Sequence, residues 1–289
     1  MAPARERGAK TEIRRSQPAQ NARMVPDVLS MMRRAVLGSA LLLCATLAFA
    51  QETPATVSVL VPIVGSVVGV NDVHWKTDVA LYNDVRQPLF VALTLPTAPD
   101  QPVIAFTIPA GATQKFADVI GQAFGMEQAL SPLIVETMGN RSVRVSANIY
   151  GIHGTDVTPP EPVPIAYTNL SFPLQTLSGL SFSALFRTNI GLVNLADAAA
   201  TFTLALQRVA GRNIAITRVT IPPNAVSHTS IQTLFPMITS GDDFMVVVEM
   251  TGPRSSVYAS VVDNATSEAH FISPSVGAPD ARYAGVASQ

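Results

Sequence analysis

Apolar and polar side chains alternate through much of the chain, and this alternation predicts β-strands. In the segment 75–83, one face of the expected strand carries Trp75, Thr77, Val79 and Leu81. The intervening positions include a lysine and an aspartate, so the other face is more polar. Alternation with one apolar face is typical of a half-buried antiparallel strand.

The same criteria predict further short strands, which are separated by turn residues such as Pro, Gly and Asn. They lie at 89–95, 103–108, 133–136, 141–150, 186–194, 200–207, 214–221, 244–250 and 256–262. Only 116–124 and 230–237 suggest a helical turn. No long amphipathic helix is present to cover a parallel sheet, so we expect an all-β antiparallel sandwich rather than an α/β fold.

The chain also repeats itself. Matching segments recur at offsets of 111 to 113 residues: Trp75–Asn83 with Phe186–Asn194, Ile108-Pro109 with Ile221-Pro222, and Ser146–Ile149 with Tyr258–Val261. Pro62 would match Pro173 at the same spacing. About seven short strands in each copy predict two tandem immunoglobulin-like sandwiches. We expect a first domain at 51–162, a second at 163–274 and a flexible tail at 275–289, with the proline-rich segment 158–164 as a semi-rigid spacer.

The N-terminal 50 residues have a different character. Arg33 and Arg34 precede an uncharged apolar stretch, 35–49, and the sequence Ala48-Phe49-Ala50 lies at its end. A basic segment, a short apolar segment and a small-residue cleavage motif predict a signal peptide that is cleaved after Ala50. The stretch is short for a bilayer span, although an uncleaved anchor is an alternative. Residues 1–50 are therefore expected to be an extension and a signal peptide, and the protein to be periplasmic, cell-surface or extracellular.

Charge and cysteine content exclude several classes of protein. The chain of 289 residues has 19 Lys and Arg and 20 Asp and Glu, but eight of the basic residues precede residue 35. The remainder is acidic, so we expect no nucleic-acid partner, because phosphate neutralisation needs a basic face. The single cysteine, Cys44, lies in the signal segment, so no disulfide is expected.

Two pairs of repeated polar residues are expected to determine the fold. Thr77 and Thr188 suit strands, and Asn83 and Asn194 suit strand ends, where an asparagine side chain can bond turn backbone groups. The repeated aromatic position, Trp75 and Phe186, has two interpretations. The rings could be a sugar-stacking platform, but the alternation favours a place in each sandwich core.

One local cluster has the chemistry of a metal site. Asp72, His74 and Asp78 would project on the same strand face, and such a set can bind a divalent metal. The second copy has Ser183, Leu185 and Asn189 instead, so a solvated polar face is the preferred interpretation. Because common catalytic motifs are also missing, we expect no catalytic, metal or cofactor-binding residue.

The segments Phe186–Asn194 and Tyr258–Asn264 resemble a loose group of bacterial secreted proteins with tandem β-sandwich modules. The resemblance lies in a W/F-R/K-T-D/N strand and an A-S-V-V-D-N closing strand, and it covers nearly all of 54–274. It implies a module fold and provides no catalytic residue. The first copy departs from the closing motif, with Ser146–Gly151 at that place.

Together these observations predict a secreted, non-enzymatic module for binding or scaffolding at the cell envelope or outside the cell. Its partner would be a protein or polysaccharide of the envelope, and the mature chain would have no membrane span. Two alternatives stay open. One is a periplasmic pilus-type chaperone that acts by β-strand addition. The other is a metal-dependent enzyme with a site near Asp72, His74 and Asp78.

Overall fold

The computed structural model describes residues 56–276 except 140, 169–171 and 209–211. All of them belong to one compact unit, Pro54–Gln289. The expected signal peptide and nearly all of the expected tail lie outside the described residues. Within the described part of the chain, no helix is long and apolar enough to cross a membrane.

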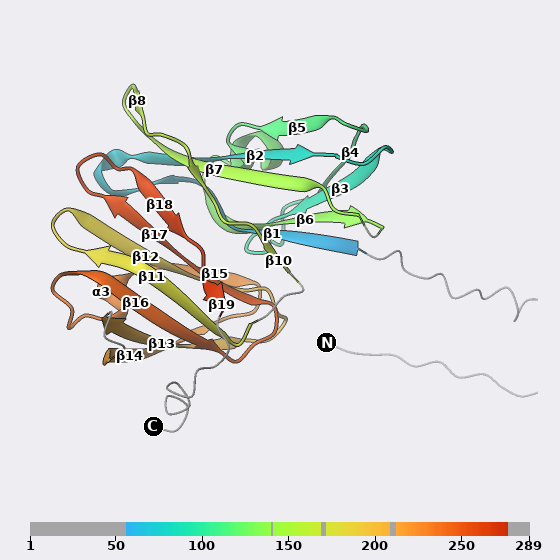
Figure 1. Ribbon diagram of the computed structural model, residues 1–289. Helices are drawn as coiled ribbons and strands as arrows, with labels where there is room; N and C mark the ends of the chain where they lie inside the picture. The colour runs from blue at the N-terminus through green and yellow to red at the C-terminus, as the bar shows by residue number, and fades with distance from the viewer. Residues whose placement is uncertain (1–55, 140, 169–171, 209–211, 277–289) are drawn as a thin grey trace, which may run out of the picture. The chain divides into compact units, whose positions relative to one another are not determined.

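The first half of the unit is a sandwich of two antiparallel layers (Figure 1). One layer has the order β4-β3-β6-β1 and the other has the order β5-β2-β7. The strands are β1 (Thr56–Val68), β2 (His74–Tyr82), β3 (Leu89–Thr94), β4 (Ile104–Ile108), β5 (Thr113–Phe116), β6 (Ala129–Met138) and β7 (Arg144–His153). Strand β1 pairs first with β6 and, from Ser66 onward, also with β2, so it links the two layers. A turn, η1 (Val70–Asp72), and a short helix, α2 (Val119–Phe124), complete this half.

The second half repeats this arrangement. Its layers have the orders β14-β13-β16-β11 and β15-β12-β17. The strands are β11 (Leu174–Phe182), β12 (Phe186–Asn194), β13 (Ala200–Arg208), β14 (Asn213–Ile221), β15 (Ala225–Ser230), β16 (Gly241–Met250) and β17 (Ser255–Asp263). The helix α3 (Ile231–Leu234) follows β15, as α2 follows β5. Each half therefore places equivalent strands in equivalent positions.

Strand registers show that the repeat extends to individual residues. Thr77 faces Ile149 between β2 and β7, and Thr188 faces Val261 between β12 and β17. Both halves also have a register shift in the first strand, after Val61 in β1 and after Leu177 in β11. A β-bulge is a specific local feature, so its recurrence at the same place supports a common local structure for the two strands.

The first strands correct one detail of the sequence alignment. The matched bulges make Val61 equivalent to Leu177, so Pro62 corresponds to Ser178 rather than to Pro173. The reason is the connection to the next strand, which is longer in the first half because it contains η1. The offset of 111 applies to β2 and β12 but not to the strands before them.

The order of strands differs from that of an immunoglobulin domain. If the seven main strands described in each half are lettered in chain order, the layers are D-C-F-A and E-B-G. An immunoglobulin constant domain has A-B-E-D and C-F-G. Here the first strand pairs with the sixth, and the seventh pairs with the second. The all-β sandwich is confirmed, whereas the immunoglobulin-like detail is not.

Short strands extend each half beyond the expected ends. The proline-rich segment contains β9 (Glu161–Pro162), which pairs with β7, and it is followed by β10 (Ala166–Tyr167), which pairs with β1. Another short strand, β8 (Asp156–Val157), lies at the end of β7. The second half has β18 (Ala269–Ile272) on β17 and β19 (Ser275–Val276) on β11. The segment 158–164 is thus attached to the first sandwich along β7 rather than free as a spacer, and the first two residues of the expected tail are paired.

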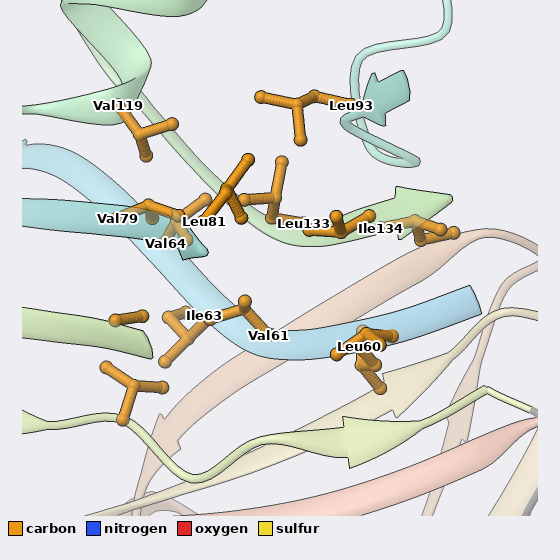
Figure 2. Close-up of a cluster of buried hydrophobic side chains, with 14 of the residues drawn as sticks. Leu60, Val61, Ile63, Val64, Val79, Leu81, Leu93, Val119, Leu133 and Ile134 are labelled. Atoms are coloured by element: carbon orange, nitrogen blue, oxygen red, sulfur yellow. The ribbon is translucent and has the colours of Figure 1, made fainter. Parts of the chain in front are cut away.

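Each half has its own apolar core between its layers. In the first half, Figure 2 shows Val64 of β1, Val79 and Leu81 of β2 and Leu133 of β6 close together, with Val119 of α2 pointing toward them. All five are essentially inaccessible to solvent. The second core gathers equivalent positions such as Leu180, Ile190 and Leu192.

Candidate binding pocket

Two buried asparagines hold equivalent loops in the two halves. Asn83 Nδ2 donates to the carbonyl oxygens of Gln87, Ile108 and Pro109 at 2.8, 2.9 and 3.1 Å, and Asn83 Oδ1 accepts from Val85 N. Asn194 makes the same four contacts with the corresponding residues, Ala198, Ile221, Pro222 and Ala196. Both side chains are completely buried. The prediction that these asparagine side chains bond turn backbone groups at the strand ends is confirmed.

The repeated threonines connect the first and second strands of each half. Thr77 Oγ1 accepts from Gly65 N at 2.9 Å, and Thr188 Oγ1 donates to Ser181 O at 2.6 Å. Both threonines are fully buried. These hydroxyls have backbone partners within the scaffold, which agrees with the structural role expected for them.

The repeated aromatic position is only partly buried. Trp75 and Phe186 are both of intermediate exposure, although the next inward residues, Thr77 and Thr188, are completely buried. Trp75 packs against the first core and also borders a pocket. Its indole lies so close to Gly69 that a Cβ added there would be 2.6 Å from Nε1. The expected core position therefore holds only in part for these rings.

The structure does not bring Asp72, His74 and Asp78 together as a metal site. Asp72 and His74 are exposed, and Asp78 accepts a hydrogen bond from Asp118 N at 3.0 Å. His74 and Asp78 are four residues apart on an extended strand, which separates them by roughly 13 Å. Among the described residues, no group of three or more His, Cys, Asp and Glu side chains could hold a metal ion.

Equivalent sheets of the two halves differ on their outer faces, which point away from the core of their own half. On the β5-β2-β7 sheet, the outer face has polar and exposed side chains such as Tyr82, Lys115 and Ser146. On the β15-β12-β17 sheet, the equivalent outer face is covered. There Val193 and Tyr258 are completely buried and belong to the apolar cluster of the first half. The first half thus packs on the outer face of the second.

Tyr258 occupies the centre of this contact. Its cross-strand neighbour is Gly191, where an added Cβ would be 2.0 Å from the ring, so only glycine leaves room for it. Its hydroxyl is hydrogen-bonded to His228 Nδ1 at 3.0 Å, and the two rings stack with centroids 5.8 Å apart. Burial raises the pKa of Tyr258 and lowers the pKa of His228 to about 4. His228 is therefore neutral at pH 7, although its side chain retains exposed surface.

Beside this contact lies a pocket of about 360 Å³ between the two halves. The first half provides an apolar wall that includes Ile63, Trp75 and Leu130, together with Gly69 and Val70 of the longer β1–β2 connection. The second half provides Phe271 and Val262 and a group of polar side chains, namely Arg187, Asn189, His228, Ser230 and Ser260. Apolar walls with a few convergent polar groups are typical of small-molecule sites, and this volume lies within their usual range.

Arg187 is the only charged side chain among the described residues that line the pocket, when His228 is neutral. It is partly buried, and burial lowers the pKa of its guanidinium. Its Nη1 donates to Asn264 Oδ1 at 2.7 Å. No carboxylate of the described residues lies within ion-pair distance of it. Among the described residues, the other four guanidinium N–H groups have no hydrogen-bond acceptor.

Another, larger cavity of about 700 Å³ lies in the first half between Asp84, Arg144 and Tyr167. It is more open to solvent than the pocket beside Trp75. Asp84 and Arg144 pair with each other there, and Arg141, which also lines this cavity, is exposed to solvent. We therefore regard the pocket beside Trp75 as the candidate site.

Comparison with known proteins finds no matching family model, curated protein or solved structure. The resemblance to bacterial secreted modules stays a prediction, as do export and the envelope partner.

Sequence reasoning did not find the pocket, because its polar residues are spread over three strands of the second half. One signal could have revealed the contact beside it, namely the uninterrupted apolar run Val59–Val64, all of which is buried. Such a run is typical of a strand that is covered on both faces.

Proposed function

We propose that this chain is an exported, non-enzymatic binding protein that holds a small ligand between its two sandwiches. The observation that carries the proposal is the pocket beside Trp75, with apolar walls from the first half and polar side chains from the second. A ligand in this position would contact both halves at once. The fold alone would not select a function, so the proposal rests on this site.

Export and the place of action rest on the N-terminal sequence. The basic, apolar and small-residue segments that precede residue 51 support secretion to the periplasm, the cell surface or the medium. The non-enzymatic role is proposed because the polar groups of the pocket do not include a nucleophile that is paired with a base. Ser230 and Ser260 line the pocket, but His228 bonds Tyr258 through Nδ1. A protein or polysaccharide partner of the envelope stays a prediction.

The chain contains a single tryptophan, Trp75, so intrinsic fluorescence reports directly on the pocket. Octanol is a suitable neutral probe because it is apolar and small. We expect octanol to change the Trp75 emission of the full chain saturably. Native mass spectrometry of protein purified from cells would then identify any retained small molecule.

A pocket-filling variant gives a matched control. Val262 lines the pocket, and the equivalent residue of the first half is Tyr150 on β7. Val262 is buried against the pocket, so the larger ring of Val262→Phe should occupy the free volume beside it, and circular dichroism checks that the sheet is retained. We expect Val262→Phe to abolish the octanol response, and Tyr150→Val to keep it. A folded wild-type chain that gives no response to octanol and retains no small molecule would contradict the proposed function.

A further inference from the structure

A charged cluster on the first half has a changed counterpart in the pocket. In the first half, Lys76 and Asp78 lie on β2, and Asp118 is the N-cap residue of α2. The matched registers place Arg187 and Asn189 at the equivalent positions of β12. Ser230 is the N-cap residue of α3, as Asp118 is of α2, although the strand register places Ser230 one residue earlier, opposite Asn189. The second half keeps the cation and replaces both carboxylates by neutral side chains.

The first-half cluster balances its own charges. Lys76 Nζ lies 2.6 Å from Asp118 Oδ2, and Asp118 N donates to Asp78 Oδ1. Tyr150 adjoins this cluster, and burial together with the Asp78 charge raises its pKa to about 12. The cation of this half therefore already has a carboxylate partner from its own chain.

The second-half cluster leaves its cation without one. Arg187 bonds the neutral Asn264 and has no carboxylate within ion-pair distance among the described residues. Asn189 and Ser230 line the same pocket and can donate hydrogen bonds. An unpaired guanidinium in partly buried surroundings favours an anion, because Arg binds carboxylates with two parallel hydrogen bonds.

We propose that the pocket binds a small monocarboxylate with an apolar body. Its carboxylate would pair with Arg187, in the role that Asp118 has beside Lys76. Its apolar body would lie against Trp75, Phe271 and the aliphatic wall of the first half. This inference rests on the proposed function, since it specifies the class of ligand for the same pocket. A single positive charge in the pocket matches a single carboxylate.

Octanoate and octanol separate the charge from the apolar body, because they share the alkyl chain. Both are titrated into the full chain, and Trp75 emission is recorded. We expect octanoate to bind more tightly than octanol. Arg187→Gln should weaken octanoate binding roughly 10- to 100-fold, which is the loss expected for a hydrogen bond to a charged group. Octanol binding should stay within about twofold, because the apolar walls are unchanged.

A second variant gives the N-cap of α3 the residue type that caps α2 in the first half. Ser230→Asp introduces the carboxylate that Asp118 supplies to Lys76, and aspartate is also a good N-cap residue, so α3 should be preserved. We expect this variant to lose octanoate binding and to retain octanol binding. Lys76→Gln, which changes the paired cation of the first half, should leave both affinities unchanged.

The outcomes distinguish the two proposals. If octanol binds but octanoate does not bind better, or if Arg187→Gln leaves octanoate binding unchanged, the pocket stands and the monocarboxylate inference is wrong. If neither probe changes Trp75 emission in the folded wild-type chain, and the protein purified from cells retains no small molecule, both the inference and the proposed function are wrong. Circular dichroism of each variant establishes that the comparison is between folded proteins.

Discussion

The two halves share a scaffold and differ in the faces that they present. Both have the same strand order, the same bulge in the first strand and the same buried asparagine network. On the first strand, however, the first half carries Leu60, Pro62 and Ile63 where the second half carries Thr176, Ser178 and Gly179. The first set is buried, and two of the second set, Ser178 and Gly179, are exposed.

The differences on the second layer are complementary to those on the first. The second half has Gly191, Val193 and Tyr258 on the outer face of its β15-β12-β17 sheet, where the first half has Ala80, Tyr82 and Ser146. The contact thus joins different layers of the two copies and is heterologous. A heterologous contact continues into further copies unless its free faces prevent it. The free face of the first half has polar side chains such as Lys115 and Ser146, whereas the edge strand β14 of the second half also exposes Ile214 and Ile216.

The largest expected effect concerns the covered face. Tyr258→Ala should lower the free energy of unfolding by about 4 kcal/mol, because it removes a fully buried ring and leaves a cavity. The equivalent Ser146→Ala is on an exposed position and should change stability by less than about 0.5 kcal/mol. Urea denaturation of both variants measures the difference.

A double-mutant cycle sharpens this result. Gly191→Ala should destabilise the wild-type chain because the new methyl group meets the Tyr258 ring. In the Tyr258→Ala background the same change should be nearly neutral, since the ring is gone. Equal losses for Tyr258→Ala and Ser146→Ala would show that the second face is not covered in solution.

The next largest loss of stability should come from changes to the shared scaffold, and it should be the same in both halves. Asn83→Ala and Asn194→Ala each remove a buried amide that serves three carbonyl oxygens and one backbone N–H. Leaving such groups without partners should cost about 3 kcal/mol in either case. Urea denaturation checks both variants. A large loss for one asparagine and none for the other would break the equivalence of the two halves.

The scaffold could be predicted from the sequence because local signals determine it. Alternation at 75–83 and 186–194 identified β2 and β12 to within a residue, and asparagine at each strand end identified the buried loop anchors. The first strands β1 and β11 were not predicted, and neither were the short strands β5 and β15. The layers of β5 and β15 depend on pairing with β2 and β12, which is a tertiary contact that no local pattern carries.

The pocket could not be predicted in the same way, because it depends on how the halves pack. Lys76 and Arg187 have the same local sequence context. Lys76 pairs with Asp118, whereas Arg187 lines the pocket together with Ser230. The neighbours of Arg187 are determined by the register between β12 and β15 and by the position of Trp75 across the contact. Position-by-position comparison of the two copies, once the register is known, isolates these exchanges.

The smallest expected effect is a pH dependence that only the second half should show. The packed surroundings lower the pKa of His228 to about 4 from an ordinary value of 6.5. Between these two values the unfolded chain binds more protons at this residue than the folded chain does. Stability is therefore lost as the pH falls from about 6.5 toward about 4, and it is fully present above that range.

His228→Gln removes this titration and keeps a hydrogen-bonding side chain near the Tyr258 hydroxyl. We expect the melting temperature of the wild-type chain to fall more steeply than that of His228→Gln between pH 6.5 and 4. Lys115 of β5 is the first-half equivalent of His228, because each faces the matching residue of the second strand. Lys115→Gln leaves His228 in place, so it should leave the wild-type slope unchanged. If the melting temperatures of the wild type and of His228→Gln fell equally between pH 6.5 and 4, His228 would not be confined by the contact between the halves. That result would remove the electrostatic difference between the two equivalent faces.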